Sequence, residues 1–177
     1  MQPSVLKRTE EYKAAYAEWK AGDRRKQLLN VFKEIYESSF FGQGDARCDI
    51  IRQPQYSMMV LHYGDDFFDG DFTYLMDLMQ ETLIAEGYFN YMSDQKQQTL
   101  DGGVKQTIDR HYLKPATIFE TTDISKLDRL YGNVTIETFY EDNEAKLLKL
   151  TCNYYSERQS IKEKGIDKLM EVILKSL

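Results

Sequence analysis

The spacing of apolar residues predicts four main helices. Near the N-terminus, one apolar stripe over residues 4–20 and a wider one over residues 24–40 predict two helices, either a helical hairpin or one helix bent near Gly22. Further stripes predict a helix at about residues 72–86 and a last helix at about residues 160–176. The apolar positions of these two helices are Phe72, Leu75, Met76, Met79 and Leu83, and Ile166, Leu169, Met170, Ile173 and Leu174.

Alternating side chains predict strands between the helices. Residues 46–64 predict a strand with a bend or an edge position at Pro54. In its second half both alternating sets of side chains are mostly apolar, which is typical of a strand covered on both faces. The remaining predicted strands span residues 88–92, 104–112, 116–121, 134–139 and 148–154, with a hairpin turn at 101–103 and a short helix at 123–132. The polar residues 93–99 either extend the strand 88–92 at a sheet edge or loop out.

This order of elements predicts an α+β fold. We expect a single domain over residues 1–177, in which residues 1–40 form the helical hairpin. Residues 41–177 are expected to form an antiparallel meander of about five to six strands with one internal helix and a C-terminal helix packed on the sheet. If the sheet curls around that last helix, a cavity opens between them.

Composition indicates a folded protein of the cytoplasm. Apolar residues make up 42% of the 177 residues, which is typical of a globular domain and excludes a disordered chain. Cys48 and Cys152 are too few for a disulfide framework, so we expect two reduced and partly buried thiols. The first residues lack the apolar core of a signal peptide, and no apolar run approaches the roughly 18 residues of a membrane span, so we expect neither a secreted nor a membrane protein.

The charge of the chain is concentrated in one segment. Residues 1–40 have a net charge of +2, residues 41–101 of −8 and residues 102–177 of zero, which together give −6. An acidic field of this kind repels nucleic acid and attracts cations or basic partners. The alternative is that the acids only keep the surface soluble.

The segment HYGDDFFDGDF, residues 62–72, is the most unusual stretch of the acidic part. Alignment to a calcium-binding EF-hand loop fails because Phe67 and Met76 would occupy ligand positions. A looser Mg²⁺ or Ca²⁺ site would use Asp65, Asp66 and Asp69. The competing interpretation is a helix start, with Asp69 or Asp71 as the N-cap and one of the two phenylalanines packed against the helix as a hydrophobic staple.

Two histidines provide the candidate catalytic groups. His62 is near Asp65 in sequence, and Asp109 and His111 share one face of a predicted strand. Such pairs are also common in proteins without activity. The chain contains no GxSxG, HExxH or Cys-His signature that would favour an enzyme.

The sequence therefore favours a non-enzymatic intracellular binding protein of the adaptor, chaperone or immunity type, without a cofactor. Thirteen tyrosines, mostly on predicted strands, suit an interaction surface on the sheet. We expect another protein as the partner, no nucleic acid and no membrane. The candidate binding residues are Tyr63, Asp65, Asp66, Phe67 and Phe68.

The alternative is a small-ligand pocket protein, or a weak hydrolase or isomerase, with its cavity between the sheet and the C-terminal helix. In that case His62, Tyr63, Asp65 and His111 would converge on the cavity. The two hypotheses differ in a simple structural expectation. A pocket enzyme brings the histidines together, whereas a binding protein keeps them apart and exposes an apolar patch.

Overall fold

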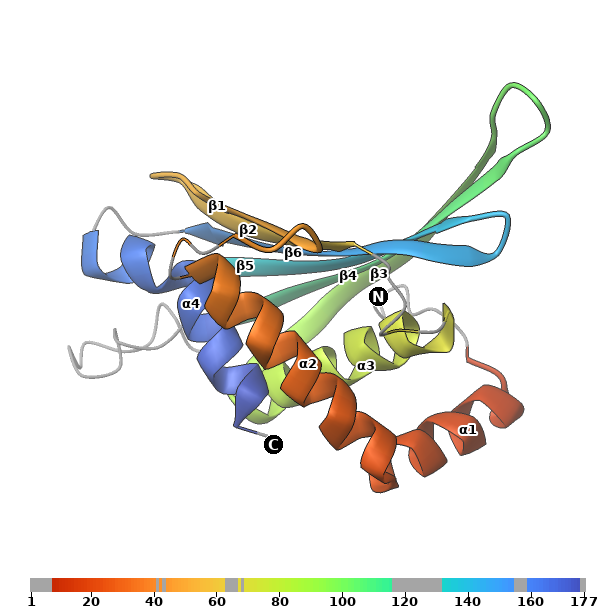
Figure 1. The fold of residues 1–177 in the computed structure, drawn as a ribbon, viewed down its shortest axis with the longest axis horizontal. Helices are drawn as coiled ribbons and strands as arrows, with labels where there is room; N and C mark the ends of the chain where they lie inside the picture. The colour runs from red at the N-terminus through yellow and green to blue at the C-terminus, as the bar shows by residue number, and fades with distance from the viewer. Residues whose placement is uncertain are drawn as a thin grey trace.

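The described residues form one antiparallel sheet with helices on one side of it (Figure 1). The computed structural model describes residues 8–40, 42, 44–62, 67, 69–115, 132–154 and 159–175. The helices are α1 (Glu10–Ala21), α2 (Asp23–Phe40), α3 (Asp69–Ala85) and α4 (Gln159–Leu174). The strands are β1 (Cys48–Arg52), β2 (Tyr56–His62), β3 (Tyr88–Thr99), β4 (Lys105–Pro115), β5 (Gly132–Glu141) and β6 (Glu144–Tyr154). The predicted α+β fold is confirmed, while the predicted strand 116–121 and nearly all of the predicted helix 123–132 lie outside the described residues.

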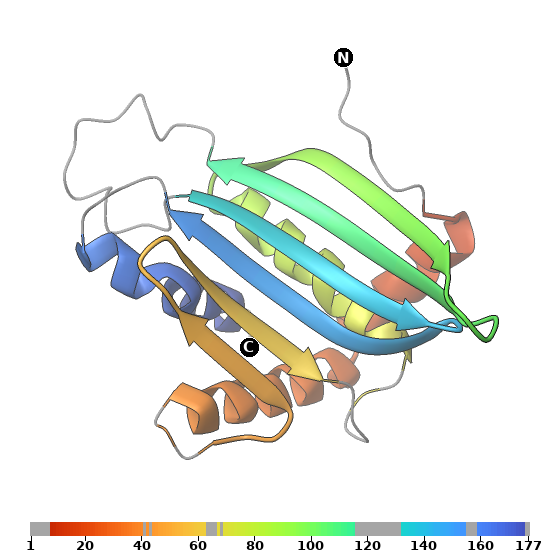
Figure 2. The same cartoon turned by 90° about the horizontal axis from the view of Figure 1, so that it is seen from above.

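The sheet combines the predicted meander with a hairpin at its far side. Its strand order is β1-β2-β6-β5-β4-β3, and every neighbouring pair is antiparallel (Figure 2). Pro54 lies in the turn between β1 and β2, so the bend predicted there becomes a hairpin. The polar residues 93–99 extend β3 instead of looping out, and Gly102 and Gly103 adopt the positive φ angles that the turn into β4 requires.

The two faces of the sheet have different surroundings. The inner face is the one that α2, α3 and α4 cover, and the outer face is the opposite one, on which no described helix lies (Figure 1). In β2 the inner residues Ser57, Met59 and Leu61 are buried, whereas the outer residues Met58 and Val60 remain partly exposed. Because this strand has apolar residues on both sides, the sequence predicted that both of its faces would be covered. Within the described residues that prediction is wrong for the outer face.

The inner face and the helices enclose the core. The two predicted apolar stripes of α3 and α4 are confirmed, since nine of their ten residues are buried and only Leu174 is partly exposed. Cys48 and Cys152 are free and buried, as expected. Among the described helices, none has the length and apolar content needed to cross a membrane.

Helix α3 begins at Asp69, three residues before the predicted start. The ring of Phe67 stacks on that of Phe72 with 5.1 Å between centroids, and only 2% of Phe67 is exposed. These residues occupy the positions of a hydrophobic staple, which fixes how the chain enters a helix. The structure thus corrects the assignment of Phe67 to a binding surface, because this side chain belongs to the core.

Polar contacts attach helix α1 to α3. Trp19 is the one buried residue of α1, and its indole Nε1 donates a hydrogen bond to the Asp71 carboxylate at 3.2 Å. The guanidinium of Arg24, at the start of α2, donates to the other oxygen of Asp71 at 2.8 Å. Asp71 was one of two predicted helix caps, with Asp69 as the other, but it lies inside the first turn of α3, is fully buried and connects α3 to α1 and α2.

We call these polar contacts between the N-terminal segment, residues 8–24, and α3 the polar seam. Two further contacts continue it along α3. Tyr12 donates a hydrogen bond to Asp77 at 2.6 Å, and Lys20 forms an ion pair with Glu81. Asp71, Asp77 and Glu81 of α3 are thus paired with residues of the N-terminal segment. Part of the charge segregation in the sequence is therefore neutralised inside the molecule, and is not left for an external partner.

We expect Arg24→Ala to destabilise the protein by about 1.5–3 kcal/mol, because the substitution removes a charge-assisted hydrogen bond to a fully buried carboxylate. Urea-induced unfolding followed by circular dichroism would measure the change. Lys33→Ala, on the same helix, is the matched control: its ion pair with Glu37 is exposed, so the loss should stay within about 0.5 kcal/mol. Equal effects of the two substitutions would contradict the structural role of Asp71.

Candidate functional site

The two catalytic candidates on β4 lie together on the inner face. Asp109 and His111 are separated by one residue, so their side chains point to the same side of the strand, and both are almost fully buried. Arg8, just before α1, lies between Asp109 and Asp77 of α3. Buried titratable groups are candidates for function, and their partners decide what they can do.

Asp109 is held by a side chain on each side. Gln95, which is opposite it on β3, donates a hydrogen bond from Nε2 to Oδ1 at 2.7 Å. The guanidinium of Arg8 lies 3.6 Å from the other carboxylate oxygen. Asp109 therefore contacts Gln95 and Arg8, and not the predicted partner His111.

Asp77 of α3 is the second carboxylate of this inner polar cluster, which we define as Arg8, Tyr12, Asp77, Gln95, Asp109 and His111. It accepts the hydrogen bond from Tyr12 and lies 3.5 Å from Arg8, whose guanidinium also stacks over the Tyr12 ring at 4.9 Å. Burial raises the pKa of Asp77, although Arg8 and Tyr12 oppose that effect. Burial and the neighbouring Asp77 also raise the pKa of the Tyr12 hydroxyl.

His111 is a neutral imidazole at pH 7. Burial lowers its pKa to about 4, and the positive charge of Arg8 acts in the same direction. Its Nδ1 lies 2.9 Å from the Ser93 hydroxyl, while Nε2 contacts no hydrogen-bonding group among the described residues. A base with a pKa this low is poorly matched to proton transfer near neutral pH.

The sequence reasoning missed most of this cluster. Arg8, Tyr12 and Asp77 belong to helical segments whose polar positions resemble ordinary solvated surface. Gln95 lies in a polar stretch without any motif. No local signal separates these four residues from other polar residues, because only the packing of α1 and α3 over β3 and β4 brings them together.

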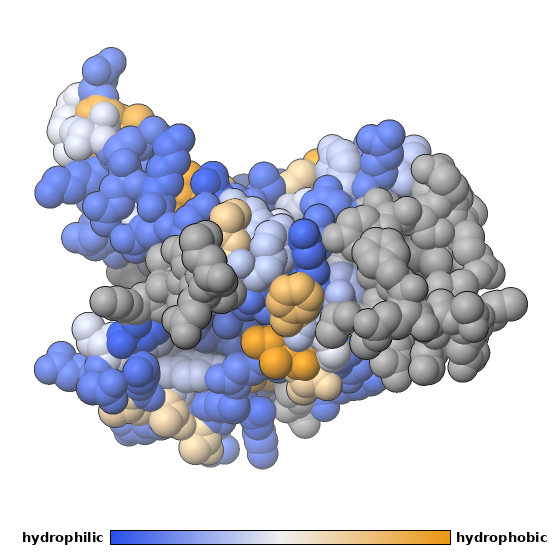
Figure 3. All heavy atoms as spheres, turned by 180° about the vertical axis from the view of Figure 1, so that it is seen from behind, coloured by the Kyte–Doolittle hydropathy of each residue, from blue (hydrophilic) through white to orange (hydrophobic). Residues whose placement is uncertain are grey.

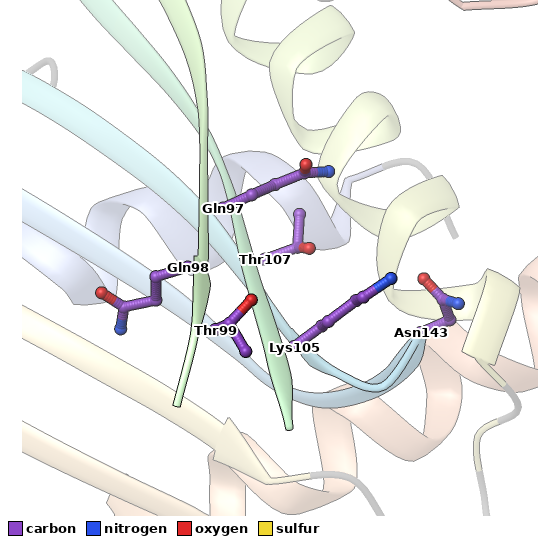
Figure 4. Close-up of a pocket in the computed structure, with 6 residues that line it drawn as sticks. All are labelled: Gln97, Gln98, Thr99, Lys105, Thr107 and Asn143. Atoms are coloured by element: carbon purple, nitrogen blue, oxygen red, sulfur yellow. The ribbon is translucent and has the colours of Figure 1, made fainter. Parts of the chain in front are cut away.

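A polar pocket of about 410 Å³ lies next to the inner polar cluster (Figure 4). Figure 4 shows Gln97, Lys105 and Thr107 pointing from the β3–β4 hairpin toward α3, with Asn143 of the β5–β6 turn beside them and Gln98 pointing the opposite way. Gln97 donates to Gln95 at 3.5 Å, which connects the pocket wall to Asp109. The pocket is thus lined by hydrogen-bonding groups and one cation.

This pocket does not lie between the sheet and the C-terminal helix, where the sequence predicted a cavity. The sheet-facing residues Ile166, Leu169, Met170 and Ile173 of α4 are fully buried in the core. The backbone N–H of Ile166 also donates to the Ser57 hydroxyl of β2 at 2.7 Å. Along its described residues α4 is packed closely against the sheet.

His62 lies on the outer face, on the opposite side of the sheet from His111. Its Nε2 is 3.1 Å from a carboxylate oxygen of Asp49 on the neighbouring strand β1. The register through β6 and β5 aligns His62 with Ile108, which is three residues from His111 and therefore points the other way. The expectation that the two histidines converge on one cavity is wrong.

The remaining candidates from the acidic loop lie outside the described residues. These are Tyr63, Asp65, Asp66 and Phe68, together with the side chain of Asp69. The proposed metal site of Asp65, Asp66 and Asp69 therefore stays a prediction. Within the described ranges, no group of three or more His, Cys, Asp or Glu residues is arranged to hold a metal ion.

The outer face carries an aromatic cluster at its β3–β4 side. Tyr91 lies 6.4 Å from Phe89 and 6.2 Å from Tyr112 between ring centroids, and the ammonium of Lys114 stacks over the Tyr91 ring at 4.3 Å. A β-bulge between Asn90 and Met92 makes room for Tyr91 beside Tyr112. These are the tyrosines of the sheet that the sequence associated with an interaction surface.

Charged residues cross the middle of the outer face in alternating order. Successive strands place Asp94, Arg110, Glu137 and Lys149 side by side. Glu137 accepts a hydrogen bond from Arg110 at 2.8 Å, which raises the pKa of Arg110. Glu137 also lies 3.9 Å from Lys149. The charges of this row largely cancel, so the face combines apolar rows with a nearly neutral polar centre.

Comparison with known proteins identifies no relative of this chain: no family model matches it, and neither does any curated protein or solved structure.

We expect His111 to make the protein less stable as the pH falls. In the unfolded chain its pKa is near 6.5, so between about pH 6.5 and 4 the unfolded state binds a proton that the folded state excludes. The total loss is on the order of 3 kcal/mol. His111→Gln should remove this part of the pH dependence, as measured by urea unfolding at several pH values.

The raised pKa of Asp77 has the opposite effect, because it makes the folded state more stable as the pH falls. This contribution is the same in the wild type and in His111→Gln, so it cancels when their free energies of unfolding are compared. His62→Gln, on the outer face, is the matched substitution and should leave the loss due to His111 between about pH 6.5 and 4 in place, because it keeps His111. If His111→Gln also kept this loss, the imidazole would not be neutral in the folded protein.

Proposed function

We propose that this chain is a non-enzymatic protein-binding module that binds its partner through the outer face of the sheet. The observation that carries the proposal is that this face is rich in apolar and aromatic residues but has no helix over it in the described part of the chain. Its larger apolar side chains are Ile51, Tyr56, Met58, Val60, Phe89, Tyr91, Met92, Ile108, Tyr112, Phe139 and Leu147.

The composition of the outer face suits a protein partner. Tyrosine, phenylalanine, methionine and arginine are enriched at protein interfaces, and all four occur here. The central row of paired charges would provide orientation, because like charges placed opposite one another disfavour wrong partners. The separation of His62 from His111 also supports binding, since it removes the convergent site that the enzyme hypothesis required.

The inner polar cluster supports this proposal as well. Asp77 and Asp109 are neutralised by Arg8 and hydrogen-bonded by Tyr12 and Gln95, so their chemistry is used within the fold. The adjacent pocket is lined by polar residues alone, whereas small-ligand pockets are mostly apolar with a few polar groups. A small-ligand function is therefore less well supported.

The proposal includes an intracellular, cytoplasmic location. Both cysteines are buried free thiols, which suits a reducing compartment. An adaptor, chaperone or immunity-type role is compatible with this location and with the partly exposed apolar face.

We expect Ile51→Asp to reduce recovery of the partner at least tenfold, because a charge would be placed in an apolar contact. The assay is affinity capture from the source organism with quantitative mass spectrometry. Ile84→Asp is the matched control: Ile51 is 37% exposed on the outer face, and Ile84 is 45% exposed on α3. The two variants carry the same substitution on different surfaces.

Thermal unfolding should first show that both variants are folded. The proposal predicts a partner that is retained by Ile84→Asp and lost by Ile51→Asp. An interacting protein that is retained by both, or lost equally by both, would show that the outer face is not the binding surface.

A further inference from the structure

Strand β3 forms one edge of the sheet and is unusually long for an edge strand. It spans Tyr88–Thr99 and pairs with β4 on one side, while no described strand pairs with its other side (Figure 2). An unpaired edge presents a row of backbone N–H and C=O groups that can bind another strand.

The hairpin turn between β3 and β4 determines which residues of β3 direct their backbone groups away from β4. The N–H of Leu100 donates to the carbonyl of Val104 at 2.8 Å, so the backbone groups of Leu100 point toward β4. Because successive residues of a strand direct their backbone groups to opposite sides, the backbone groups of residues 94, 96 and 98 also point toward β4. The groups of Ser93, Gln95, Gln97 and Thr99 point away from the sheet.

Charges on β3 select one register for pairing with a second copy. If Gln95 of one chain lies opposite Gln95 of the partner subunit, all outward-pointing groups from Ser93 to Gln97 are in register. Asp94 then lies opposite Lys96 of the partner subunit, and the two-fold axis repeats this pair. A shift of this register by two residues in one direction places the two Asp94 side chains opposite each other. A shift in the other direction places the two Lys96 side chains opposite each other, and like charges in such positions are destabilising.

Apolar residues at the two ends of β3 fit the same register. The bulge at Tyr91 adds one residue to the strand, so Phe89 comes opposite Leu100 of the partner subunit. Phe89 and Leu100 are 45% and 41% exposed and lie on the outer face. Figure 3, which views the molecule from behind and therefore from the side of the β3 edge, shows apolar atoms on the projecting β3–β4 hairpin and a second apolar group near the centre, with hydrophilic residues between them.

We propose that two copies of this chain associate through their β3 edges, antiparallel and with the two-fold axis at Gln95, so that their sheets become continuous. The second copy is favoured as the occupant because β3 is complementary to itself in backbone groups, in charge and in exposed apolar side chains. The interface is small, so we expect a dissociation constant in the micromolar range.

Charge exchange at positions 94 and 96 tests this proposal. Sedimentation velocity from about 1 to 100 µM should show a reversible dimer of the wild-type chain. Lys96→Glu places two like-charged pairs in the interface and should weaken the dimer at least tenfold. The double variant Asp94→Lys, Lys96→Glu exchanges the two charges and should restore association to within a fewfold of wild type.

Lys105→Glu, on β4, is the matched control for net charge and should dimerise as the wild type does. Circular dichroism would show that each variant is folded. A monomer at all concentrations would overturn the proposal and show that Asp94 and Lys96 only protect the edge. A dimer that is insensitive to Lys96→Glu, or one that the double exchange does not restore, would place the interface elsewhere.

Discussion

The polar seam between the N-terminal segment and α3 is the contact on which the rest of the structure depends. Asp71 of α3 is a fully buried carboxylate and Asp77 a largely buried one, and such groups are very costly to bury unless paired. Trp19 and Arg24 satisfy the first, and Tyr12 and Arg8 the second. Since α1 contributes a single buried residue to the core, these polar contacts, together with the packing of its aromatic rings against Tyr74 of α3, determine where it lies.

This seam also helps to hold the described helices on one face of the sheet. The N-terminal segment connects to α3 on the inner side, and α2 and α4 are tied there through Asp167, which accepts hydrogen bonds from Tyr36 and Arg52. All described helices are therefore gathered over one face (Figure 1). The outer face keeps its apolar rows and its paired charges, and these are the features that make it the proposed binding surface.

Charge is used in three different ways in this molecule. In the seam it joins helices, and on the outer face alternating pairs such as Arg110 and Glu137 give a nearly neutral surface. On β3, Asp94 and Lys96 have the spacing that selects a single antiparallel register with a second copy. A net charge of −6 describes none of these arrangements, because each depends on which residues become neighbours.

The sequence by itself determined the elements, because periodic burial is a local property. The apolar stripes of α3 and α4, the bend at Pro54 and the turn before β4 all follow from side chains close together in the chain. Only the tertiary structure decided that Asp109 meets Arg8 and Gln95, that His62 and His111 lie on opposite faces, and that Phe67 is buried. These outcomes depend on strand order and helix placement, which are set by contacts between residues far apart in sequence.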